Sequence, residues 1–129
     1  MAQISNIIPP SNFTRNGATF RQYRIAQMNA AGDVSEATAA TQILEGIIVD
    51  PGRENGDQCA IETIGEAIGE AGAAFDEGAQ LTADADGQLI ATTTVGNFIV
   101  AHAIEAATAA GDRVRVRVLP GHRRFAATA

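Results

Sequence analysis

Three glutamates repeat at a spacing that could bring carboxylates together for acid–base chemistry. Glu62, Glu66 and Glu70 lie four residues apart, and paired carboxylates of this kind can serve as general acid and base. No recognisable motif places a histidine, lysine or tyrosine beside them. A solvated acidic face therefore explains the repeat better than a catalytic site does.

The segment 84–87, Asp-Ala-Asp-Gly, resembles the start of a calcium-binding loop. With Gly87 at the sixth position of such a loop, Thr82 would be first and Thr93 last. Those positions require an aspartate and a bidentate glutamate. The match fails, and a tight hairpin turn at Asp86 and Gly87 accounts for the residues instead.

Other chemistry-bearing residues are few and scattered. His102 and His122 are twenty residues apart and Cys59 is far from both, which is no metal-binding spacing. There is no nucleophile elbow, phosphate loop or dinucleotide fingerprint. We therefore expect no catalytic residue, no metal, no cofactor and no small-molecule substrate, and predict that the protein is not an enzyme.

The charge of the chain is unevenly distributed. The net charge is −6, which argues against general attraction to nucleic acid or an anionic membrane. Residues 1–112 hold four arginines and fifteen acids, whereas residues 113–129 hold five arginines and no acid. One interpretation is cross-strand pairing of these arginines with glutamates. The other is a contact patch for an acidic partner, made of Arg113, Arg115, Arg117, Arg123 and Arg124 with His122 between.

The single cysteine excludes an intrachain disulfide, and it is most simply a small core residue. No signal peptide and no apolar run long enough to span a bilayer is recognisable. We therefore expect a soluble protein that is made in a reducing compartment.

The residues between 78 and 119 predict a scaffold of short strands. Runs 80–83 and 88–92 flank the Asp-Gly turn, and the alternation of Arg and Val over 113–118 places the valines on one face. A shift of 55 residues superimposes 32–64 on 87–119, and the turns keep register. The glycines that mark these turns are Gly32, Gly56, Gly87 and Gly111. Two similar β units are thus predicted.

The expected fold class is mostly β, a small β-barrel or β-sandwich-like domain over residues 18–121. Residues 60–73 favour a strand followed by a bent strand, with a short helix as the alternative, because three glycines weaken a helix. Residues 122–129 read as a basic tail. Residues 1–17 contain Pro9-Pro10 and read as an extended arm, whose apolar side chains (Ile4, Ile7, Ile8, Phe13) must be buried either on a partner or on their own domain.

Several segments in a fixed order resemble the phage capsid cement, or head decoration, proteins. They include Gly-Ile-Ile-Val at 46–49, Leu-Thr-Ala-Asp-Ala-Asp-Gly at 81–87, Ala-Ile-Glu-Ala-Ala at 103–107 and Leu-Pro-Gly at 119–121. The resemblance covers residues 20–121. The arm, the tail, and Ala101 and His102 depart from the family pattern.

The resemblance implies a structural protein, made in the host cytoplasm, that binds the outside of an assembled capsid and stabilises it. Its implied partners are the major capsid protein and itself, as a homotrimer at three-fold or quasi-three-fold positions. We expect the arm and the arginine patch to make the capsid contact. One alternative is a small β-barrel module that binds nucleic acid, which is weakened because the chain lacks aromatic residues near these arginines for base stacking. The other alternative is an accessory binding domain.

Overall fold

The described residues form ten β-strands and contain no helix. The computed structural model describes residues 11–125. The strands are β1 (Ser11–Thr14), β2 (Ile25–Met28), β3 (Val34–Glu36), β4 (Leu44–Asp50), β5 (Gln58–Glu62), β6 (Gly65–Glu70), β7 (Gln80–Ala83), β8 (Leu89–Ala91), β9 (Phe98–Ala103) and β10 (Arg113–Arg124). The mostly β prediction is confirmed.

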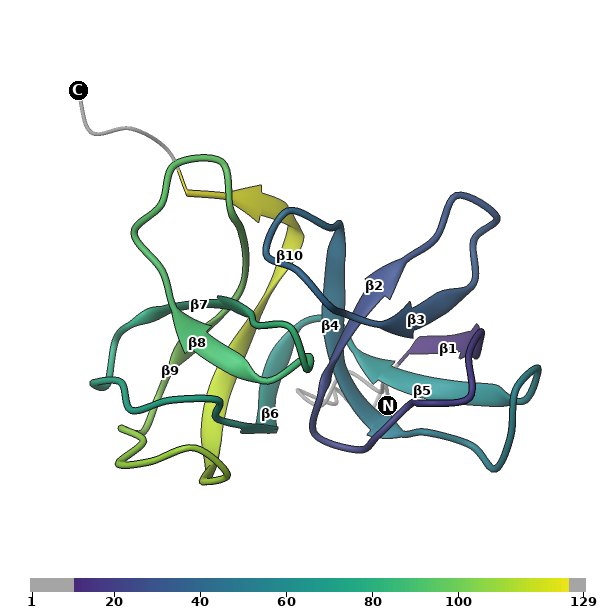
Figure 1. The fold of residues 1–129 in the computed structure, drawn as a ribbon, viewed down its shortest axis with the longest axis horizontal. Coiled ribbons are helices and arrows are strands. Elements are labelled where there is room, and N and C mark those ends of the chain that lie inside the picture. The colour runs from purple at the N-terminus through teal and green to yellow at the C-terminus, as the bar shows by residue number, and fades with distance from the viewer. Residues whose placement is uncertain (1–10, 126–129) are drawn as a thin grey trace, which may run out of the picture.

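Two five-stranded antiparallel sheets lie side by side and pack on each other (Figure 1). The first has the order β1-β5-β4-β2-β3 and the second β6-β10-β9-β7-β8. A single parallel bridge connects the two ends of each sheet, Arg15 to Val34 in the first and Ala71 to Leu89 in the second. One bridge is not a ladder, so neither sheet closes into a barrel. The architecture is sandwich-like, and the barrel alternative was wrong.

The two sheets are the two similar units predicted from the 55-residue shift. β2 begins at Ile25 and β7 at Gln80, β3 at Val34 and β8 at Leu89, each 55 residues later. The strand orders of the sheets also correspond position by position. The repeat extends beyond the segment that sequence comparison aligned, because β1 corresponds to β6. We call residues 11–62 the first unit and residues 65–124 the second unit.

The core has two parts, divided by the alternation of side chains along the strands. Ala26 and Ile48 face a cluster inside the first unit. Their neighbours Ile25 and Ile47 face the opposite way, into a cluster shared with the second unit. Successive side chains of a strand point to opposite faces, so β2 and β4 are buried on both. This double burial explains why 43–49 reads as a nearly continuous apolar run.

Backbone hydrogen bonds join the two units at three places. Glu70 N donates to Tyr23 O, Ile25 N donates to Gly87 O at 2.8 Å, and Phe98 N donates to Ala40 O. The Asp-Gly hairpin turn of the second unit therefore docks on the first unit. Residues 60–73 form the connection, as β5 and β6 with a break at residues 63–64, so two strands and not a helix occupy this segment.

Strands β1 and β10 extend into the ranges that the sequence assigned to the arm and the tail. Residues 11–14 are strand β1, paired with β5, and Arg15 is buried by hydrogen bonds to three carbonyl groups. β10 continues past Pro120 to Arg124 through a register shift after Val118. Pro120 lies within this irregularity, where a proline is tolerated.

The turn before β10 gives a prediction about acid stability. The Asp112 carboxylate accepts hydrogen bonds from Thr108 N and Oγ1, both at 2.8 Å, and from Ala109 N. The Thr108 backbone bond is the main cause that lowers the Asp112 pKa. A carboxylate with a lowered folded pKa adds stability above its unfolded pKa of about 3.9, and that stability is lost as the pH falls through the folded value. Asp112→Asn should therefore flatten the acid limb of the unfolding midpoint measured against pH, and an unchanged limb would contradict this.

Candidate functional site

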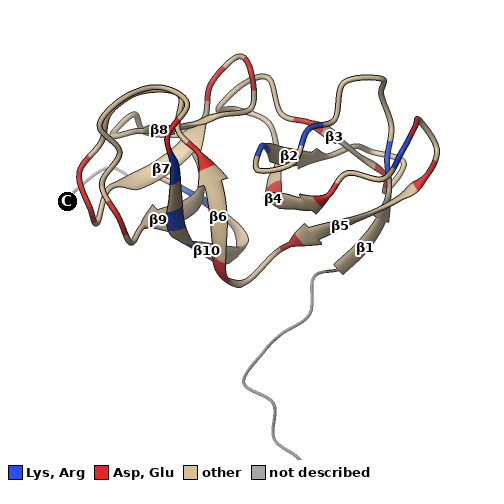
Figure 2. Cartoon of the chain, turned by 90° about the horizontal axis from the view of Figure 1, so that it is seen from below, with Lys and Arg blue, Asp and Glu red and all other residues tan. Residues whose placement is uncertain are grey.

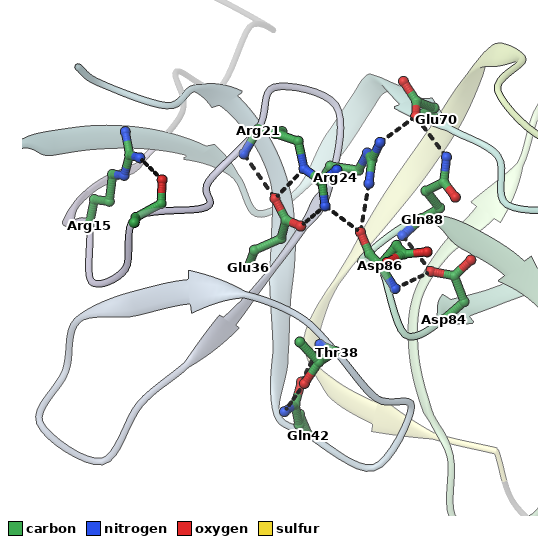
Figure 3. A network of polar contacts seen from close by, with 11 residues as sticks. Arg15, Arg21, Arg24, Glu36, Thr38, Gln42, Glu70, Asp84, Asp86 and Gln88 are labelled. Atoms are coloured by element: carbon green, nitrogen blue, oxygen red, sulfur yellow. Dashed lines mark hydrogen bonds and ion pairs between the residues drawn. The ribbon is translucent and has the colours of Figure 1, made fainter. Parts of the chain in front are cut away.

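A network of arginines and carboxylates lies where the two units meet (Figure 3). Glu36, at the end of β3, is buried. It accepts hydrogen bonds from the backbone N and the guanidinium of Arg21, on the segment before β2. This pairing with Glu36 raises the Arg21 pKa. Removing Arg21 would leave the Glu36 carboxylate buried without its charged partner, which is strongly destabilising.

Arg24 connects this network to the second unit. Its Nη2 lies 2.8 Å from Glu70 Oε2, and its Nη1 donates to Asp86 O at 2.8 Å. Gln88 Nε2 also donates to Glu70, at 2.7 Å. The side chains of Arg24 and Glu70 are only 12% and 13% exposed. These contacts hold the hairpin turn of the second unit against the first unit, so one role of the network is to fix the two sheets relative to each other.

A depression of about 360 Å³ opens beside this network. Its lining is Arg21, Gln22, Tyr23, Arg24, Glu70 and Arg113. Tyr23 has a positive φ of 72°, which a bulky residue rarely adopts. The Arg113 guanidinium carbon lies 4.4 Å from the centroid of the Tyr23 ring, close enough for a cation–π interaction. We name this depression the junction pocket.

Arg113, Arg115 and Arg117 of β10 lie on one exposed face of the second sheet (Figure 2). In the pairing with β6, Arg113 is opposite Glu70 and Arg117 is opposite Glu66. Arg113 Nε is 3.7 Å from Glu70, and Arg115 is 3.7 Å from both Glu66 and Glu105. These pairs are what the cross-strand interpretation predicts. Exposed ion pairs of this length contribute little stability, but they offset the positive charge of the face. The face is consequently less basic than the sequence of β10 alone implies.

The last part of β10 carries the remaining predicted arginines. Arg124 stacks on Phe98, with its guanidinium carbon 4.6 Å from the ring centroid, and Arg123 lies opposite Ile99. His122 Nε2 is 2.8 Å from Glu45 of β4. This segment therefore belongs to the second sheet and touches the first unit, and only Arg113 of the predicted patch reaches the junction pocket.

The predicted arm residues divide at the limit of the described chain. Ile4, Ile7 and Ile8 lie outside the described residues. Phe13 is in β1, half-buried against the inner cluster of the first unit, and is paired with Cys59. Burial raises the pKa of the Cys59 thiol. Within the domain, then, Phe13 packs on its own sheet.

The remaining features of residues 11–125 concern one shifted carboxyl group, possible metal clusters, membrane-spanning helices and exposed apolar side chains. Desolvation raises the pKa of the Glu62 carboxyl group. Across residues 11–125, no cluster of three histidine, cysteine, aspartate or glutamate side chains is arranged to hold a metal ion. In the same part of the chain, no helix could span a membrane. The exposed large apolar side chains there are Ile43, Ile68 and Val95.

Sequence reasoning missed most of the junction pocket. Arg21, Tyr23 and Arg24 precede β2, Glu70 ends β6 and Arg113 begins β10. No spacing in the sequence connects them. A weak signal was available in Arg21 and Arg24, which are two of only four arginines in the first 112 residues.

The sequence of the chain was compared with profiles of known protein families. A sequence profile described as "phage cement protein" matches residues 22–118. The chain belongs to the phage cement protein family. The match covers most of both units and leaves out β1 and the end of β10. As a member of this family, the protein is a structural protein associated with phage capsids.

A solved structure has a similar fold. The N base of the head fibre gp8.5 of bacteriophage phi29 is 20% identical, with a TM-score of 0.64, over 84% of this chain and 92% of that chain. At this identity the likeness concerns the fold alone. A search of curated protein sequences gives no match to this cement protein.

Proposed function

We propose that this cement protein binds the outer surface of an assembled phage capsid and stabilises it. The observation that carries the proposal is the family match over residues 22–118. The contact is with the major capsid protein, and the protein acts as a homotrimer at three-fold or quasi-three-fold positions. It is made in the host cytoplasm and incorporated into the virion.

The physical character of the domain supports this role. Three backbone hydrogen bonds and the contacts of Arg24 with Glu70 and with Asp86 O join the two sheets. A surface that is already organised before binding loses little conformational freedom on binding, which favours affinity. The net charge of −6 favours solubility before assembly. Three linked copies would strengthen weak individual contacts through avidity.

Nucleic-acid binding finds less support than capsid binding. A nucleic-acid site needs a net positive face, and glutamates on β6 oppose Arg113 and Arg115 of β10 at 3.7 Å. Two aromatic rings beside arginines of β10, Tyr23 and Phe98, are each already covered by an arginine. The accessory-domain alternative gains no specific observation, and we retain capsid binding alone.

Co-sedimentation with purified capsids tests the proposal. The protein should pellet with undecorated shells of its phage in a saturable manner. It should not pellet with shells that already carry the decoration protein, nor with linear duplex DNA. Failure to pellet with undecorated shells, or equal pelleting with DNA, would contradict the proposed function.

The start of the chain gives a separate prediction. If residues 1–10, with Ile4, Ile7 and Ile8, add to an exposed edge of a capsid subunit as an extended segment, deleting residues 2–10 should weaken shell binding by about tenfold or more. That corresponds to about 1.4 kcal/mol or more of binding free energy. The unfolding midpoint should not change, because β1 remains. Both quantities are measured by co-sedimentation and urea denaturation.

A longer deletion provides the contrast. Removing residues 2–16 also removes β1 and Arg15, whose guanidinium donates to three backbone carbonyls. This variant should lose stability by roughly 2–4 kcal/mol, since it loses a strand pairing and exposes the inner cluster of the first unit. If the 2–10 deletion binds shells as tightly as the full chain, residues 2–10 do not contribute to the capsid contact.

A further inference from the structure

A small depression lies at the edge of the second sheet. It has a volume of about 150 Å³ and is lined by Glu66, Ala67, Ile68 and Arg115. β6 is the last strand on this side of its sheet, and such a strand offers backbone N–H and C=O groups to another chain. Ile68 is 40% exposed, whereas Ala67 packs against the core cluster that the two units share. A depression of this size can receive one aliphatic side chain, and we name it the β6 depression.

The connection between β8 and β9 projects from the same unit and carries Val95 (Figure 1). Val95 is 60% exposed. Thr92 Oγ1 accepts hydrogen bonds from Thr94 N at 3.1 Å and from Asn97 Nδ2 at 2.9 Å. These bonds organise the loop before any partner binds, so little conformational freedom is lost when Val95 becomes buried. We name residues 92–97 the Val95 loop.

Positive charge lies beside the Val95 loop. Gly96 N donates to Phe125 O, which places the end of β10, with Arg123 and Arg124, next to the loop. Neither arginine forms an ion pair within the described residues, and the loop and residues 119–125 contain no aspartate or glutamate. The rest of the chain holds seven arginines and fifteen acids, so a second copy is, in sum, an acidic partner for this end. Complementary charge of this kind favours association and fixes its orientation.

We infer that the Val95 loop of one copy inserts into the β6 depression of the next copy, and that three such contacts close the homotrimer. A ring of three requires two different surfaces on each chain, because a surface that pairs with itself gives a two-fold dimer. The second unit supplies both surfaces, a projection and a depression, whereas contact of Ile68 with Ile68 would be of the self-pairing kind. The inference rests on the homotrimer of the proposed function and names its interface.

Disulfide trapping tests this contact directly, because a disulfide forms only between closely opposed side chains. The double variant Val95→Cys, Ile68→Cys, incubated with oxidised glutathione, should give covalent dimers and trimers on a non-reducing gel, with the trimer as the largest species. Either substitution alone offers one exposed thiol per chain, since Cys59 is buried, and cannot go beyond a covalent dimer. Absence of covalent trimer from the double variant would overturn the interface, and longer covalent chains would overturn the closed ring.

Four single substitutions separate the interface from other exposed positions. Val95→Asp and Ile68→Asp place a charge on the two sides of the contact. Thr93→Asp is exposed in the same loop, and Ile43→Asp changes an apolar side chain whose exposure of 43% is close to the 40% of Ile68, so these two are the matched controls. Because all four side chains are exposed, the far-UV circular dichroism of each variant should match that of the unchanged protein.

Sedimentation equilibrium of the four variants measures the association. The unchanged protein and both controls should associate as trimers, and Val95→Asp and Ile68→Asp should associate at least about tenfold more weakly, as expected for side chains at the centre of an interface. If Val95→Asp associates as the unchanged protein does, or if Ile43→Asp weakens association as much, the interface is wrong and the homotrimer stands.

The proposed function is decided separately by co-sedimentation with shells. An unchanged protein that is monomeric at every concentration overturns this inference, and its pelleting with undecorated shells would still support capsid binding. A covalently trapped trimer that fails to pellet with those shells supports the interface and contradicts the proposed function.

Discussion

Replacing Gly46 by alanine is expected to destabilise the protein by about 3 kcal/mol. Gly46 lies in β4, which is buried on both faces and pairs with both β2 and β5. A Cβ at this position would lie well inside van der Waals contact with the Glu62 carbonyl oxygen and 3.0 Å from its carbon. Backbone atoms of a neighbouring strand cannot move aside as a flexible side chain can. Urea denaturation of Gly46→Ala measures the change.

The second unit supplies a matched control for this substitution. Ala101 of β9 is the residue 55 positions after Gly46, and each pairs with the equivalent strand, Ala26 in one unit and Leu81 in the other. Ala101→Gly should cost only about 1–2 kcal/mol, from lost burial of a methyl group and from backbone entropy. If Gly46→Ala is no more destabilising than Ala101→Gly, the close approach of β4 and β5 is not what requires glycine.

Gly87→Val should also destabilise strongly, by about 3 kcal/mol. Gly87 has a φ of 73°, and a β-branched residue in this conformation costs about 1–2 kcal/mol. A Cβ would in addition meet Ala37 O and Glu36 Cγ, both at 3.0 Å, and overpacking adds about 1–3 kcal/mol. The second contribution exists because this turn docks on the first unit, where Gly87 O accepts a bond from Ile25 N.

Gly32 separates the two contributions. It is the equivalent turn residue of the first unit, with a φ of 92° and no atom within 4 Å of an added Cβ. Gly32→Val should therefore show the conformational cost alone, about 1–2 kcal/mol. Equal losses at the two positions, measured as shifts in the urea midpoint, would mean that the docked turn contributes nothing to the contact between units.

Local patterns in the sequence were sufficient to predict the second unit and the repeat. The Asp-Gly turn gave the hairpin, β7 paired with β8, and alternation of Val114 and Val116 gave the buried face of β10. These signals depend on neighbours in the chain, so the sequence contains them. The low identity between the units hid β1, because its equivalent in the second unit, β6, carries Gly69 and Glu70 where β1 has Phe13 and Thr14.

The junction pocket could not be predicted in the same way. Its residues come from three separate segments, and the docking of one unit on the other brings them together. Sequence analysis left two interpretations open for Arg113, pairing with glutamates across the strands or a basic contact patch, because it could not show which glutamates lie near the β10 arginines. The charge of a surface depends on pairing between strands, and that pairing is a property of the topology.

Cryo-electron microscopy of shells with and without the protein tests the central claim most directly. Undecorated shells of the phage are incubated with an excess of the protein, and the two reconstructions are subtracted. The proposal predicts added density of three copies around three-fold or quasi-three-fold positions on the outer surface. Identical reconstructions, or added density only on the inner surface, would contradict the claim that this protein binds and stabilises the outside of the capsid.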